Sequence, residues 1–297
     1  MDRKQKILQV IIAVLLIFIC SVFSFISYHS VKSDKDFKTS YTPTLFLHGS
    51  PTTRNSMLPM IKRIESDVQG NNTLVLIVDE DGHVRTQGKY QKVRNPLIQI
   101  IFENNDSTEY NQVKWLTKCL EFLYKEYGIK KVNFVGHSLG GVDILLYLAQ
   151  YEPKVRRKVP QIVKVVTLGA PFNSVRDNLN EDYKKIMRDG PRHTNETFDY
   201  IREGMKKHPL NVKDWLNVAG DKYDNGQNDG TVPVGSVVSI SKLMRQQHID
   251  YEVKIVPYIR HSGLHESTTV DKLVEKFLWG DQSSMKKNLK KNEKSVK

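Results

Sequence analysis

Short apolar runs alternate with longer amphipathic stretches along most of this chain. The short runs end at turn-forming residues, as buried strands do, and the long ones repeat apolar residues at helical spacing. We expect strands at 44–47, 74–78, 97–102, 131–135, 163–168, 215–219 and 251–257, a hairpin arm at 83–90, and helices at 56–68, 108–127, 139–151 and 268–279. This alternation predicts an α/β fold with a mostly parallel central sheet and helices on both of its faces.

The start of the chain departs from this pattern, because residues 7–26 form an uncharged apolar run. A helix of about 20 residues is roughly 30 Å long and matches the hydrocarbon core of a bilayer. Arg3, Lys4 and Lys6 precede the run, and positive residues tend to stay cytoplasmic. We expect a single-pass transmembrane helix within residues 1–30, with the remainder of the chain outside the cell.

Secretion after signal-peptide cleavage is the alternative to this anchor. The apolar region of a signal peptide is usually about 7–15 residues long and ends at a small-x-small site. The run in this chain is longer and lacks such a site. Its length and its sequence therefore favour an uncleaved anchor at the cell membrane.

The rest of the chain divides into a linker at 31–42, a globular domain at 43–280 and a tail at 281–297. Inside the domain, the polar and charged segment 172–213 interrupts the alternation between two strands. Ligands bind at the carboxyl ends of the strands in such sheets, so we expect this insertion to form a helical cap over the site. A passive surface excursion is the alternative.

Charge and cysteine content limit the classes of partner and cofactor. The net charge is +12, and the tail contributes six lysines against two acidic residues, a composition typical of disorder. No aromatic and basic platform accompanies this charge, so we do not expect nucleic-acid binding. Contact of the tail with anionic lipid or wall polymer suits an exported protein better, and a tail that is merely solvated is the default alternative. Of the two cysteines, Cys20 lies in the apolar run and Cys119 in a helical pattern, which predicts no disulfide framework and no zinc site.

The segment 136–140 (Gly-His-Ser-Leu-Gly) carries the clearest chemistry. It fits the G-x-S-x-G pattern, with an apolar strand before it and an apolar helix after it. Small residues on both sides of the serine let the strand and the helix approach, and the turn exposes the hydroxyl above the sheet. The helix N-terminus then directs N–H groups to the same place. We expect Ser138 to be a nucleophile.

A serine hydroxyl is a weak nucleophile that needs a base, and the base needs an orienting carboxylate. In this fold the acid precedes the histidine along the chain. Asp229 lies beside a glycine in the polar loop after strand 215–219 and is the candidate acid. Asp221 and Asp224 share that loop and are the alternatives.

Two histidines follow strand 251–257 and compete for the role of base. His261 comes first after the strand, where the base usually lies, and is the preferred candidate. His265 lies next to the last helix and is the second candidate.

A tetrahedral intermediate needs two N–H donors near its oxyanion. Leu139, the residue after the nucleophile, supplies one candidate, and Ser50 in the loop after the first central strand supplies the other. His48 in the same loop is expected to orient it and not to act as a second base.

Several segments together carry a resemblance to a known family. In chain order they are 46–49 (Phe-Leu-His-Gly), 134–141 (Phe-Val-Gly-His-Ser-Leu-Gly-Gly), 168–172 (Leu-Gly-Ala-Pro-Phe), 228–233 (Asn-Asp-Gly-Thr-Val-Pro) and 261–266 (His-Ser-Gly-Leu-His-Glu). Over about residues 42–279 the chain resembles the uncharacterised cell-surface α/β-hydrolases of Gram-positive bacteria, which are similar to small bacterial lipases. The resemblance implies the α/β-hydrolase fold, with Ser138 as nucleophile, Asp229 as acid and His261 as base.

The expected activity is hydrolysis of a small-molecule or lipid carboxylic ester through an acyl-enzyme, with no metal or organic cofactor required. Two alternatives stay open at this point. One keeps the triad and changes the substrate to a thioester or a peptide. The other is a surface-binding module that keeps the fold without turnover.

Overall fold

The computed structural model describes residues 5, 12, 14–21, 37–50, 55–174 and 181–280. The chain divides into two units, one made of Thr39–Leu278 and the other of the two chain ends, Met1–Lys38 and Trp279–Lys297. In the unit of the chain ends, Phe37 forms an antiparallel bridge with Gly280.

Most of the predicted transmembrane run at 7–26 and the whole predicted tail at 281–297 lie outside the described residues. Within the part of the chain that the structure describes, no helix is both long enough and apolar enough to cross a membrane.

A single sheet of eight strands forms the centre of the larger unit, in the order β3-β2-β4-β1-β5-β6-β7-β8. The strands are β1 (Thr44–Leu47), β2 (Asn71–Val78), β3 (Val84–Gly88), β4 (Pro96–Phe102), β5 (Lys131–His137), β6 (Gln161–Leu168), β7 (Asp214–Asp221) and β8 (Asp250–Pro257). Only β3 is antiparallel to its neighbour. The predicted strands, the hairpin arm and the mostly parallel sheet are therefore confirmed.

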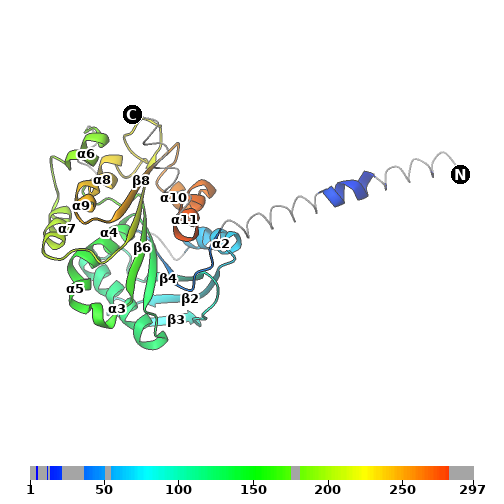
Figure 1. Ribbon diagram of the computed structural model, residues 1–297, viewed down its shortest axis with the longest axis horizontal. Helices are drawn as coiled ribbons and strands as arrows, with labels where there is room; N and C mark the ends of the chain where they lie inside the picture. The colour runs from blue at the N-terminus through cyan, green and yellow to red at the C-terminus, as the bar shows by residue number, and fades with distance from the viewer. Residues whose placement is uncertain are drawn as a thin grey trace. The chain divides into compact units, whose positions relative to one another are not determined.

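Helices cover both faces of this sheet. They are α2 (Leu58–Asp67), α3 (Glu109–Tyr127), α4 (Leu139–Leu146), the π-helical turn η1 (Tyr147–Tyr151), α5 (Glu152–Val155), the 3₁₀ turn η2 (Arg156–Lys158), α6 (Tyr183–Asp189), α7 (Glu196–Lys207), α8 (Val234–Val238), α9 (Ser241–Gln246), α10 (Gly263–Glu266) and α11 (Thr268–Trp279). Figure 1 shows α2, α10 and α11 on one side of the sheet and α3, α4, α7 and α9 on the other. Because both faces are covered, the central strands β1, β4 and β7 are buried along their whole length.

Local sequence explains where the helix before the Ser138 segment begins and ends. The Thr108 side chain accepts a hydrogen bond from the Asn111 N–H and caps α3 at its first turn. Gly128 ends the helix with a left-handed φ of 64°, which suits a residue without a side chain. The buried side chains of α3 then pack into the core beneath β5 and α4. This packing fixes the strand that leads to Ser138.

The segment 172–213 contains the helices α6 and α7, so its predicted helical character is confirmed. Phe198, Ile201 and Met205 on α7 are buried in the main core cluster. Gly204 packs so closely that a Cβ there would lie 2.6 Å from the Ala149 carbonyl oxygen of η1. The helix α7 therefore packs on the helical layer, and a capping role for the segment stays a prediction.

We expect Gly140→Ala to destabilise the protein, although alanine is favoured over glycine in a helix by about 1 kcal/mol. A Cβ at this position would lie 2.4 Å from the His48 carbonyl oxygen and 2.9 Å from that of Leu47, and backbone atoms cannot move aside cheaply. The free energy of unfolding, measured by chemical denaturation, should fall by about 1–3 kcal/mol. Gly263→Ala is the control, since its Cβ would meet only a side-chain atom at 3.5 Å. Equal stabilities for the two variants would contradict the expectation.

Candidate active site

Ser138 lies in a strained turn between β5 and α4. Its backbone has φ 53° and ψ −127°, a combination that residues with a side chain rarely adopt. The Ser138 N–H donates to the Leu168 carbonyl at 2.8 Å, which ties the turn to the end of β6. The strand–turn–helix context predicted from the G-x-S-x-G pattern is therefore present at the carboxyl edge of the sheet.

Glycines allow the backbone to close around this serine. A Cβ on Gly49 would lie 2.6 Å from the Cβ of Ser138 and 3.2 Å from its Oγ. A Cβ on Gly136 would lie 2.9 Å from the Gly140 carbonyl oxygen. The loop after β1 consequently lies directly against the Ser138 turn.

His48 holds that loop through both of its ring nitrogens. The Phe102 N–H donates to His48 Nε2 at 3.1 Å, so Nδ1 carries the proton and donates to the Gly49 carbonyl at 2.8 Å. Burial lowers the pKa of the His48 imidazole, which favours this neutral form. One nitrogen thus holds the Gly49 carbonyl of the loop and the other the end of β4, as the orienting role predicted for His48 requires.

The two candidate oxyanion donors, Leu139 and Ser50, follow the residues Ser138 and Gly49, which lie against each other. Leu139 is the first residue of α4, so its N–H has no acceptor within the helix. The Ser50 N–H shares a planar peptide group with the Gly49 carbonyl and points in the opposite direction. Because His48 fixes that carbonyl, it also fixes the direction of the Ser50 N–H.

Asp229 and His261 meet in a short hydrogen bond. His261 Nδ1 lies 2.7 Å from Asp229 Oδ2, and the side chain of Asp229 is fully buried. The other carboxylate oxygen accepts the N–H groups of Thr231 and Val232 at 2.9 and 2.7 Å. The His261 backbone N–H also donates to the Asp229 carbonyl at 3.0 Å. These bonds fix the carboxylate and leave the imidazole Nε2 as the nitrogen that can act on a substrate.

The alternative acids have other surroundings. Asp221 Oδ2 accepts the Gly226 N–H at 2.6 Å and so shapes the loop after β7. Asp224 is exposed and has a positive φ of 55°. Of the three aspartates weighed from the sequence, the structure brings Asp229 to His261.

A layer of histidines connects Ser138 to the His261 loop. The ring of His137, the residue before Ser138, lies 4.7 Å from the ring of His261 and 4.5 Å from that of His265. His137 Nε2 donates to the His261 carbonyl at 3.1 Å. Burial, followed by repulsion from His261 and His265, holds the pKa of His137 well below its usual value. His137 is thus a neutral donor that supports the loop of the candidate base.

The second candidate base, His265, is more enclosed than His261. It is 7% exposed, and burial lowers its pKa. Its backbone carbonyl accepts a hydrogen bond from Arg63 at 3.0 Å, and Arg63 also pairs with Asp271 of α11. His265 Nδ1 has no hydrogen-bond partner among the residues described, and its ring packs against that of His137, so its surroundings are those of a packing residue.

Two features of this region had not been singled out from the sequence. The supporting role of His137 could have been suspected, because it lies inside the Gly-His-Ser-Leu-Gly segment. Nothing in the sequence around Asp143 of α4 indicates a special role for this residue. It is fully buried, neither carboxylate oxygen has a partner among the described residues, and burial raises its pKa well above the usual value. That environment favours a neutral carboxyl below the Ser138 turn.

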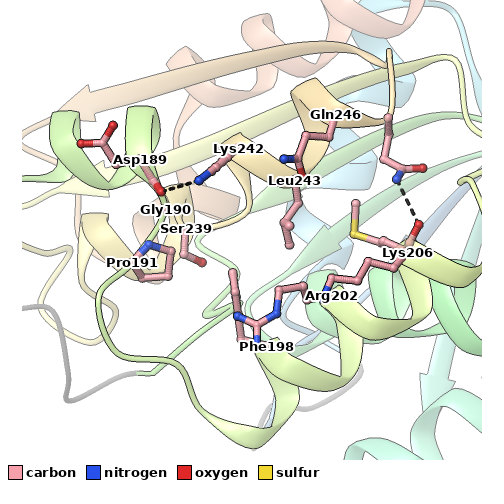
Figure 2. A pocket seen from close by; sticks show the side chains of 12 residues that line it. Asp189, Gly190, Pro191, Phe198, Arg202, Lys206, Ser239, Lys242, Leu243 and Gln246 are labelled. Carbon is pink, nitrogen blue, oxygen red and sulfur yellow. Dashed lines mark hydrogen bonds between the residues drawn. The ribbon is translucent and has the colours of Figure 1, made fainter.

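A separate pocket of about 340 Å³ lies between α7 and α9 and contains none of the candidate catalytic residues (Figure 2). The cationic side chains that line this pocket already have partners within the protein. Arg202 pairs with Asp199, Lys206 pairs with Glu203, and Lys242 donates to the Asp189 carbonyl. Nothing in this pocket suggests that it is the reaction site.

One group of described side chains has a spacing that could hold a metal ion. Asp79, Asp81 and His83 have ligand atoms within 4.8 Å of one another. Asp79 already accepts the N–H groups of Asp81 and His83, so it serves the turn between β2 and β3. The group lies in the hairpin, at the far end of the sheet from β8, and is separate from the Ser138 turn.

Comparison with known proteins agrees with the fold. The family model described as "Alpha/beta hydrolase of unknown function (DUF915)" matches residues 31–281. A crystallised gene product of Listeria innocua is 26% identical with a TM-score of 0.72, over 80% of this chain and 93% of that one. A protein of Lactobacillus plantarum named "putative cell surface hydrolase" is 22% identical with a TM-score of 0.63, over 80% and 91% of the chains, which shows a shared fold. No curated protein matches the sequence.

The burial of His137 should make the free energy of unfolding depend on pH. It stays neutral in the folded state but takes up a proton near its ordinary pKa of about 6.5 in the unfolded state, so acid favours unfolding. Between about pH 7.5 and 5.5, the wild type should lose roughly 1.4 kcal/mol more stability than His137→Gln. Denaturant titrations at each pH measure this difference. His83→Gln at an exposed position is the control, and parallel pH curves for wild type and His137→Gln would refute the expectation.

Proposed function

Because the chain belongs to the DUF915 family of α/β-hydrolases, we propose that it is a serine hydrolase that cleaves carboxylic esters through an acyl-enzyme. The observation that carries the proposal is the bond between His261 and the buried Asp229, in a loop that His137 ties to the strained turn of Ser138. An imidazole oriented by a buried carboxylate is the arrangement that activates a serine hydroxyl.

In the proposed reaction, Ser138 Oγ attacks the ester carbonyl and His261 Nε2 takes its proton. Asp229 holds the imidazole in the required tautomer and stabilises its charged form. The protonated His261 then gives its proton to the leaving alcohol. A water molecule, activated by the same imidazole, attacks the acyl-enzyme and releases the acid. This chemistry requires neither a metal ion nor an organic cofactor.

The oxyanion is proposed to bind the N–H groups of Leu139 and Ser50. Both belong to backbone segments whose positions are fixed, Leu139 by α4 and Ser50 by the bonds of His48. Donors that are already in place need no reorganisation when charge develops on the substrate oxygen. Losing one such donor typically lowers the rate by about 100- to 1,000-fold.

We further propose that the enzyme works at the cell surface, anchored by residues 1–30 and separated from the membrane by the linker at 31–42. The uncharged run at 7–26 and the basic residues before it support this location. The name of the Lactobacillus plantarum relative is consistent with it. The basic tail at 281–297 is proposed to contact anionic lipid or wall polymer.

Ser138→Ala should abolish covalent labelling of the full chain by a fluorophosphonate probe, because the probe reacts with an activated serine. Hydrolysis of a p-nitrophenyl ester should fall by roughly 10⁴-fold or more. Ser262→Ala, which removes an exposed serine near the site, is the control and should keep labelling. A folded wild type that neither reacts with the probe nor hydrolyses esters would favour the surface-binding module.

His261→Ala should lower kcat/KM for the same ester by roughly 10⁴-fold, since it removes the base. His265→Ala should cost less than about 100-fold, the lower limit expected for loss of a general base. Steady-state kinetics of the two variants, with folding checked by circular dichroism, decides between the histidines. The reverse order of effects would assign the base to His265.

A further inference from the structure

A basic hollow of about 630 Å³ lies on the surface away from the candidate active site. It is lined by Glu121, Lys154, Val155, Arg156, Arg157, Lys158 and His208. Lys154, Arg156, Arg157 and Lys158 come from one short stretch formed by α5 and η2. The single acidic side chain, Glu121, is already paired with Lys118 at 3.3 Å. The hollow therefore presents concentrated positive charge to solvent.

Interactions within the protein account for only part of this charge. Arg156 pairs with Glu152 at 3.3 Å, and Lys154 lies over the ring of Tyr151. Across the described residues, neither Arg157 nor Lys158 forms an ion pair with a carboxylate. A cation near a helix C-terminus is stabilised by the helix dipole by about 0.3–1 kcal/mol. One cation is enough for this effect, so it does not explain why four cations that repel one another lie in this stretch.

The basic hollow and the candidate active site lie at opposite edges of the sheet. Lys158 precedes β6, whereas Ser138 follows β5, and these two strands are parallel neighbours. The hollow therefore lies at the amino edge of the sheet and Ser138 at the carboxyl edge. The strand β6 has eight residues, so at about 3.3 Å per residue the two edges are roughly 26 Å apart. An occupant of the hollow would not block access to Ser138.

We propose that the basic hollow binds a strand of a flexible, phosphate-rich polyanion. A guanidinium group matches a phosphate with two parallel N–H donors, and lysine adds a compact charge. The concave shape suits a polymer strand better than a flat membrane. No Phe, Tyr or Trp is among the described residues that line the hollow, so this lining lacks the stacking surface with which proteins hold single-stranded nucleic acid. The proposal stands independently of the proposed hydrolase activity.

Charge reversal in the hollow tests the proposal in the full chain, purified in a neutral detergent. Arg157→Glu with Lys158→Glu should weaken binding of inorganic polyphosphate, measured by calorimetry, by at least about tenfold. It should also lower the slope of log affinity against log salt by about one to two. Lys89→Glu with Lys92→Glu is the matched control. It makes the same change in net charge at exposed positions after β3, keeps the basic tail, and should keep the affinity.

Three results would overturn the proposal. Equal losses of affinity in the two double variants would show that net charge or the tail, and not the hollow, binds the polymer. Tighter binding of single-stranded DNA than of polyphosphate, lost on charge reversal of the hollow, would assign the hollow to nucleic acid. Binding to vesicles of phosphatidylglycerol and phosphatidylcholine, without binding to soluble polyphosphate, would assign it to a membrane surface. Thermal unfolding of each variant confirms that loss of binding is not loss of folding.

Discussion

The close approach of three backbone segments at Ser138 is the constraint on which the site depends. The end of β1, the end of β5 and the start of α4 come so near to one another that a Cβ at Gly49, Gly136 or Gly140 would lie within 3 Å of a neighbouring atom. This closeness places the serine against the loop of Ser50. It also holds Ser138 at a positive φ, a strain that the surrounding sheet and core must offset.

Around that contact, the candidate site is assembled by backbone hydrogen bonds as much as by side chains. His48 joins the loop after β1 to the end of β4, and His137 joins the Ser138 turn to the His261 loop. Both imidazoles act as neutral groups, since burial lowers the pKa of each. In our interpretation, these two neutral histidines position the loops around Ser138, and His137 also holds the loop of the candidate base.

The sequence predicted the parts of this arrangement that have a local signature. The strands show as apolar runs, and the Ser138 turn needs small residues at fixed positions, so both could be recognised without coordinates. The bond between Asp229 and His261 joins residues that are 32 positions apart. Position in the chain reduced the candidate acids and bases to a few residues, but it did not decide among them. The burial of Asp143 and the π-helical turn η1 follow from packing between distant elements, which no short pattern records. The packing of α7 on η1 was missed for the same reason.

The placement of His261 after β8 has a consequence for how the candidate site would come apart. The strand β8 is at the end of the sheet and pairs only with β7, so it can open at lower cost than a central strand. Two bonds to the His261 backbone, from His137 Nε2 and to the Asp229 carbonyl, hold the loop from its inner side. If this border strand detached while the rest of the sheet stayed intact, the bond between His261 and Asp229 would be lost. Heating would then disrupt the candidate site before the core melts.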